Sequence, residues 1–197
     1  DPAYAFEIAV IVREGIRRMY EEQEDIFYYL TVENQNYPMP PMPEGCMEGI
    51  LKGMYKFRPC EHADWKLRAQ ILGSGAIMNE ALHAQALLAE HFEVAADVWS
   101  ITSYKELRRD GLDADRYNLL HADKPPRTPY VTQCLQNEPG VIVAASDYVK
   151  ALPDLLAKWM PRPCIALGTD GFGRSDSRAA LRDFFEVDAR HIAYAAI

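Results

Sequence analysis

The chain has 197 residues, of which 49% are hydrophobic and 25% are charged, and its formal net charge is −8. This composition is ordinary for a soluble globular protein, and the length suits one α/β domain, alone or with part of another. An acidic chain without a clustered basic stripe argues against nucleic acid or an anionic membrane as a partner, and no apolar run reaches the ~20 residues of a membrane helix.

The N-terminal part predicts one amphipathic helix and one strand. Asp1 suits the N-cap of a helix and Pro2 its first position. Apolar residues then recur at helical spacing. They are Ile8, Val12, Ile16, Met19 and Tyr20. After a polar break, residues 26–32 (IFYYLTV) are rich in aromatic and β-branched side chains, which predicts a buried strand.

Residues 33–45 (ENQNYPMPPMPEG) contain four prolines, which forbid regular structure and favour an extended path. One interpretation is an interdomain linker. The other is a docking or active-site segment, because Asn34, Asn36 and Tyr37 come just after the predicted strand. The residues alone leave both interpretations open.

Strands and helices alternate regularly after this segment. The predicted strands are 54–57, 66–72, 94–101, 141–145 and 164–167. The predicted helices are 47–52, 77–91, 104–120 with a break near Gly111, 130–136, 148–160 and 178–185. Such alternation predicts an α/β fold with a mostly parallel sheet covered by helices on both faces.

A glycine-rich loop follows the last predicted strand, in the stretch LGTDGFGRSDSRAALRDFFEVD from Leu167 to Asp188. It lacks the Lys of a P-loop and the ligand spacing of an EF-hand. Ser175 or Ser177 is expected to cap the next helix. Asp170, Arg174, Asp176 and Arg178 are expected to form a compact charged cluster. We interpret this cluster as a loop or interface element, with substrate or cofactor contact as the alternative.

The other candidate motifs are weak. The stretch LGSGAI (residues 72–77) lacks the third glycine of a dinucleotide fingerprint, and Ser74 is expected to cap the following helix. No two of the five histidines have a paired metal-ligand spacing. They are His62, His83, His91, His121 and His191. The four cysteines form no CxxC pair, which favours a reducing, cytosolic setting. They are Cys46, Cys60, Cys134 and Cys164. We therefore expect no self-sufficient active site.

Several consecutive stretches together resemble one family, the homodimeric E1 component of the bacterial pyruvate dehydrogenase complex. They are DPAYAFEIAVIVREGIRRMY, YYLTVENQNYPMPPMPEG, ILGSGAI, SITSYKELRRDG and LGTDGFGRSDSRAALRDFFEVDARHI. The resemblance covers the whole chain in order. It implies that residues 1–37 are the end of a middle, pyrimidine-binding domain. It also implies that residues 38–197 are a transketolase-type C-terminal domain, with a mixed, mainly parallel sheet, that lacks its final helices.

The resemblance also implies the chemistry of an intact enzyme. Such an enzyme decarboxylates pyruvate on thiamine diphosphate with Mg²⁺ and reductively acetylates the lipoyl group of its E2 partner, dihydrolipoyl acetyltransferase. The family's motif for Mg²⁺ and diphosphate has no match here, so no catalytic, cofactor or metal residue is carried over and this part alone is expected to bind no cofactor. Asn34, Asn36 and Tyr37 remain candidates for indirect support of the site.

For this part of the chain we expect a role in dimer and interdomain packing, in the cytoplasm. The alternatives are a stand-alone, non-catalytic scaffold domain and another enzyme of the transketolase superfamily. The chain starts without Met and ends at HIAYAAI within an apolar helical pattern, so we expect a piece of a longer protein. Apolar side chains such as Ile26, Tyr28 and Leu30 would then be exposed, which predicts self-association or instability of the isolated piece.

Overall fold

A computed structural model describes residues 1–62 and 64–197. Its sheet has five strands among these residues, in the order β1-β3-β2-β4-β5. The strands are β1 (Met54–Arg58), β2 (Leu67–Gly73), β3 (Val94–Ile101), β4 (Val141–Ala145) and β5 (Cys164–Leu167). β1 pairs with β3 in antiparallel fashion and the other pairs are parallel. The expected mixed, mainly parallel sheet is confirmed.

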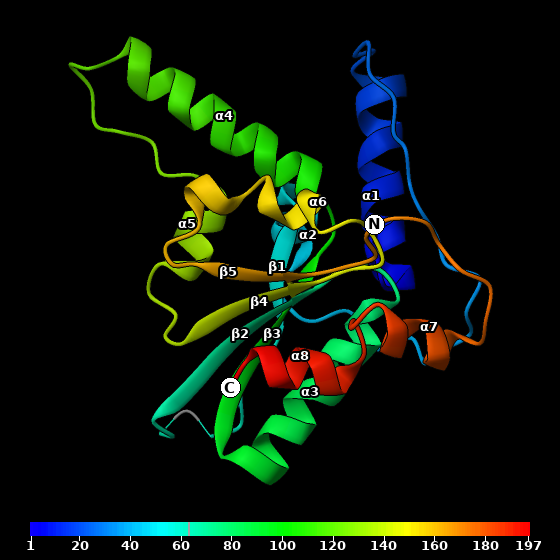
Figure 1. The fold of residues 1–197 in the computed structure, drawn as a ribbon. Coiled ribbons are helices and arrows are strands. Elements are labelled where there is room, and N and C mark those ends of the chain that lie inside the picture. The colour runs from blue at the N-terminus through cyan, green and yellow to red at the C-terminus, as the bar shows by residue number, and fades with distance from the viewer. Residues whose placement is uncertain (63) are drawn as a thin grey trace.

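Helices cover both faces of this sheet (Figure 1). The helices are α1 (Ala5–Ile16), α2 (Met47–Lys52), α3 (Ile77–Phe92), α4 (Tyr104–Leu120), α5 (Tyr130–Leu135), α6 (Ala151–Asp154), α7 (Arg178–Phe184) and α8 (Ala189–Ala195). A π-helical turn (Arg17–Glu21) follows α1, and a 3-10 turn (Ala157–Trp159) follows α6. α3 and α8 cover one face, and α4 and α5 cover the other.

The two faces follow from side-chain alternation along the strands. Ile71 and Val98 pack under α3 and α8, in a cluster with Leu88 and Ile192. Their strand neighbours Leu72 and Trp99 point to the opposite face and pack with residues of α4 and α5. Because the parallel strands are buried on both faces, they have few polar positions, and this made their bounds predictable from sequence.

α4 is continuous through Gly111, so the predicted break is wrong. Glycine is present there because the helix lies against the ring of Trp159. A Cβ atom at Gly111 would lie 2.6 Å from ring atoms of Trp159. The glycine therefore marks a close packing contact and not a helix end.

The helix predicted over 148–160 is also wrong, because only α6 and the separate 3-10 turn form there. Tyr148 lies in a turn, where its carbonyl oxygen accepts a hydrogen bond from the backbone nitrogen of Thr169. Pro153 lacks an N–H and is tolerated only in a first helical turn. Met160 precedes Pro161 and adopts the extended conformation that a proline imposes on the residue before it.

The N-terminal helix begins at Ala5, with Tyr4 at the N-cap, and not at Asp1. Asp1 is held elsewhere, because its backbone nitrogen donates to the carbonyl oxygen of Thr102. The predicted apolar stripe is not the buried face. Val12, Ile16 and Tyr20 are exposed. The buried residues of α1 are Glu7, Ile11 and Gly15.

Residues 26–32 do not form the predicted buried strand. The chain is extended there, but none of the described residues pairs with it in a sheet. Tyr28 and Leu30 pack against the small core near α1 and α2. Phe27 and Tyr29 point away, with exposed fractions of 85% and 84%. Side chains in this segment thus alternate between buried and exposed, as they do in a strand, although the segment has no partner strand among the described residues.

Candidate functional site

The two segments singled out in the sequence lie next to each other at one end of the molecule. In Figure 1 the segment after α1 and the loop before α7 run side by side. Arg178 of α7 donates a hydrogen bond to the side-chain oxygen of Asn34 over 2.8 Å. Tyr37 donates from its hydroxyl to the carbonyl oxygen of Ala3 and packs edge-on against Tyr4. Asn36 is exposed.

The four charged residues of the glycine-rich loop do not form the expected cluster. Asp170 accepts from the backbone nitrogen of Lys150 over 3.0 Å. Arg174 stacks on the ring of Phe184 at 4.0 Å. Asp176 accepts from the backbone nitrogen of Ser177, and Arg178 reaches Asn34. Ser177 caps α7 by accepting from the backbone nitrogen of Ala180, as one of the two predicted caps.

Sequence reasoning missed the partner that completes this region, Arg182. Its side chain is only 12% exposed, and its guanidinium bonds the carboxylate of Glu80 and the side-chain oxygen of Gln35, each over 2.9 Å. Glu80 also accepts from the backbone nitrogen of Ala189. The available signal was the helical spacing of Arg178 and Arg182, which puts both on one face of α7.

The glycine turn after β2 holds the start of the chain and not a ligand. Gly75 has a left-handed backbone (φ 51°), and its backbone nitrogen donates to the carbonyl oxygen of Asp1. A Cβ atom at Gly75 would lie 2.9 Å from the Asp1 carboxylate. The expectation that Ser74 caps α3 is wrong. The N-cap of α3 is Ala76, and the buried hydroxyl of Ser74 has no partner among the described residues.

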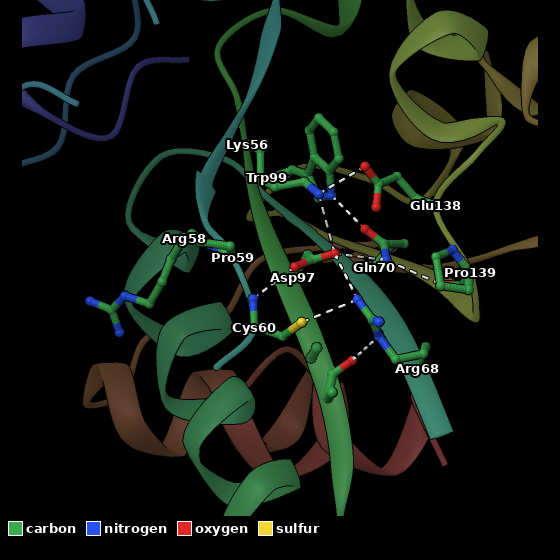
Figure 2. Close-up of polar contacts among 12 residues, drawn as sticks. Lys56, Arg58, Pro59, Cys60, Arg68, Gln70, Asp97, Trp99, Glu138 and Pro139 are labelled. Carbon is green, nitrogen blue, oxygen red and sulfur yellow. Dashed lines mark hydrogen bonds and ion pairs between the residues drawn. The ribbon is translucent and has the colours of Figure 1, made fainter. Parts of the chain in front are cut away.

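A buried carboxylate, Asp97, is the centre of a polar network on the face of the sheet under α5 (Figure 2). Its side chain is 2% exposed. It accepts from the backbone nitrogen of Cys60 over 2.7 Å and from the amide of Gln70 over 3.1 Å. Lys56 and Arg68 lie 3.3 Å and 3.5 Å from it.

The network favours the charged form of Asp97. Burial acts to raise the pKa of Asp97, but the hydrogen bonds from Cys60 and Gln70 and the charge of Lys56 outweigh it and hold the pKa below its ordinary value. Burial raises the pKa of the Cys60 thiol, and Asp97 adds to this effect. A neutral thiol and a fully bonded carboxylate do not make a nucleophile and base pair, so this network is structural.

A second buried carboxylate, Glu7, joins α1 to the sheet. It is 0% exposed. One oxygen accepts from the backbone nitrogens of Ala3 (2.5 Å) and Tyr4 (3.0 Å). The other accepts from the hydroxyls of Tyr55 (2.7 Å) and Ser100 (2.6 Å). These four donors compensate the loss of hydration of the buried carboxylate.

One group of carboxylate and imidazole side chains has metal-ligand geometry among the described residues, Asp183, Asp188 and His191. Arg190 already bonds both carboxylates, each over 2.7 Å. Burial acts to raise the pKa of Asp188, but bonds from His191 and Arg190 hold it below its ordinary value. An arginine in the place of a cation makes this an ion-pair cluster, not a metal centre.

Comparison with known families divides the chain into two matched parts. The family described as transketolase-like TK C-terminal domain matches residues 53–188. The family described as pyruvate dehydrogenase E1 component middle domain matches residues 1–40. No helix in the described part of the chain is long and apolar enough to span a membrane.

Curated relatives match over the whole length. The chain is 50% identical to the pyruvate dehydrogenase E1 component of Pseudomonas aeruginosa, 51% to that of Haemophilus influenzae and 48% to that of Escherichia coli. Each match covers 100% of this chain and 22% of the relative. The chain thus spans about a fifth of the length of these relatives.

Solved structures show the same fold at low identity. A transketolase variant from Pichia stipitis has a TM-score of 0.51 and 19% identity, over 83% of this chain and 20% of that chain. A split-gene transketolase has a TM-score of 0.51 and 16% identity, over 74% of this chain and 41% of that chain.

Proposed function

The chain belongs to the transketolase-like C-terminal domain family, and on this premise we propose that it is the C-terminal part of a pyruvate dehydrogenase E1 component. The observation that carries the proposal is about 50% identity to such components over the entire chain. The transketolases share the fold at 16–19% identity, which carries nothing about substrate.

The domain assignment is part of this proposal. Residues 1–37 would be the end of a middle domain and residues 38–197 a C-terminal domain. The match of residues 1–40 to the middle-domain family supports the first part. The exposed apolar side chains of Val12, Ile16, Phe27 and Tyr29 also support it, because such a surface on a helix and an extended segment fits contact with a neighbouring part of a larger protein.

The intact enzyme would decarboxylate pyruvate with thiamine diphosphate and Mg²⁺, and transfer the acetyl group to the lipoyl group of E2. It would act as a homodimer in the cytoplasm. Two candidate sites among the described residues do not fit these cofactors. Arg190 fills the carboxylate cluster, and the backbone nitrogen of Gly75 is already bonded to Asp1. We therefore expect this part to support packing between domains and subunits, and to be inactive alone.

A complementation assay tests the proposal. The 197-residue chain is mixed with the upstream part of an E1 component, thiamine diphosphate and Mg²⁺, and pyruvate-dependent reduction of an artificial electron acceptor is followed. Each part alone is the control. Activity that appears only in the mixture is expected. A soluble, associated mixture without activity would contradict the proposal and favour a non-catalytic scaffold domain.

A further inference from the structure

Residues 31–37, which we call the strap, cross the surface without backbone hydrogen bonds. Among the described residues, no backbone group of the strap bonds another backbone group. The strap is extended and has no sheet partner. An extended segment of this kind leaves the surface readily unless other contacts hold it.

Side chains supply the contacts that hold the strap. Thr31 donates to the carboxylate of Asp1 over 2.9 Å and accepts from the hydroxyl of Tyr148 over 3.0 Å. Tyr37 bonds Ala3 at the other end. Between these ends, Asn34 and Gln35 each accept from an arginine of α7.

Arg182 is itself held by a group outside the strap. Arg182 is held between Glu80 of α3 and Gln35, and Glu80 is held by the backbone nitrogen of Ala189 at the start of α8. Arg178 lies one turn earlier on the same helix face. The guanidinium group of Arg182 is therefore held by Glu80 of α3, which is itself bonded to the start of α8, whereas the exposed Arg178 bonds Asn34 of the strap.

We propose that α7 is an arginine clamp, in which Arg178 and Arg182 bind the side-chain oxygens of Asn34 and Gln35 and fix the strap on the sheet domain. The strap lies near the end of the part matched to a middle domain (residues 1–40), shortly before the part matched to a C-terminal domain (residues 53–188). The clamp thereby sets the direction in which the chain passes between the two. The clamp depends only on the contacts within this chain, so it stands or fails separately from the proposed enzymatic activity.

Native-state proteolysis at Glu33, the exposed acidic residue inside the strap, tests the clamp. Cleavage by a glutamate-specific protease requires the strap to lift. The cleavage rate of each folded chain is divided by the cleavage rate of a synthetic peptide with the strap sequence of the same variant. Differences in how readily the protease cuts each unfolded sequence then cancel. Two variants break the contacts from opposite sides, Arg178→Gln/Arg182→Gln and Asn34→Ala/Gln35→Ala. Arg190→Gln, an exposed arginine of α8 without contact to the strap, is the matched control.

Both variants are expected to raise the normalised cleavage rate about tenfold or more, because each removes the two charge-assisted hydrogen bonds between the strap and α7. The control is expected to match the wild-type chain. If the arginine variant loses its cooperative melt, the amide variant decides, because it leaves the pair of Arg182 and Glu80 intact. Equal rates in the folded amide variant and the wild-type chain would overturn the clamp. A wild-type rate equal to that of the free peptide would overturn it as well.

Discussion

The buried carboxylate of Glu7 gives the most direct test of how α1 is attached to the sheet. In Glu7→Ala, the backbone nitrogens of Ala3 and Tyr4 and the hydroxyls of Tyr55 and Ser100 lose their acceptor. The hydroxyls can rotate toward other partners, but the two backbone N–H groups cannot. Each unsatisfied buried donor costs about 1–3 kcal/mol, so we expect a loss of about 4 kcal/mol in the free energy of unfolding.

This loss is a large share of the ~5–15 kcal/mol that a domain has in total. Glu7→Gln keeps the shape and one acceptor, so it is expected to cost about 1–2 kcal/mol. Glu14→Gln on the same helix is the matched control. Its exposed pair with Arg17 is expected to contribute less than about 1 kcal/mol.

Urea unfolding followed by circular dichroism measures these differences from the midpoints and slopes. A double-mutant cycle with Tyr55→Phe adds a check on the mechanism. In the Glu7→Ala background the hydroxyl of Tyr55 has already lost its bond to Glu7, so Tyr55→Phe is expected to cost much less than in the wild-type chain. If Glu7→Ala cost no more than Glu14→Gln, or if the two substitutions were additive, the reasoning about four compensating donors would be wrong.

Two further predictions concern the polar network and the exposed surface. The pKa of Asp97 is lower in the folded chain than in the unfolded chain, where it is about 4. The ionised carboxylate therefore contributes its full stabilisation of the fold above about pH 4, and this contribution is lost as the pH falls below that value. Asp97→Asn should therefore lower the urea midpoint at pH 7 and make the midpoint fall less steeply below about pH 4. If the curves of urea midpoint against pH were parallel for the variant and the wild-type chain, this expectation would be wrong. The exposed rings of Phe27 and Tyr29 should make the isolated chain self-associate, and Phe27→Ser/Tyr29→Ser should lower the mass seen by light scattering. A monomeric wild-type chain with a cooperative melt would contradict that expectation.

The sheet domain was predictable because its elements carry their own signals. β4 is a continuous apolar run and β3 is mostly apolar, with Asp97 and Ser100 as its polar residues, and the bounds of both strands agree with the sequence prediction. Gly111 shows the limit of such signals. The sequence does not distinguish a glycine that packs against a tryptophan ring from a glycine that ends a helix. The ring here belongs to Trp159, which is distant from Gly111 in the sequence.

The exposed apolar face of the N-terminal part was misassigned for a related reason. Alternation along residues 26–32 identifies two faces but does not say which one finds a partner. The sequence pointed to Ile26, Tyr28 and Leu30 as the exposed set, whereas Tyr28 and Leu30 pack near α1 and Phe27 and Tyr29 are exposed. Which face is buried depends on neighbours in the fold.

The candidate site was predicted only in part. The strap and the glycine-rich loop were singled out separately, and the bond between Arg178 and Asn34 that joins them was not predicted. Their contact joins residues at opposite ends of the chain, a pairing that no local pattern encodes. Arg182 and Gln35 were missed because a half-buried arginine on a short polar helix looks like a surface residue until Glu80 is placed beside it.

The order of the strands has a consequence for synthesis on the ribosome. β2 lies between β3 and β4, but β4 begins at Val141, long after β2 ends at Gly73. At about 5–20 residues per second, β4 emerges roughly 3–14 seconds after β2. Once β3 has paired with β2, and until β4 emerges, β2 has one open edge, to which a strand of another nascent chain can pair. The nascent protein is thus most exposed to co-translational aggregation after β3 has emerged and before β4 closes the sheet.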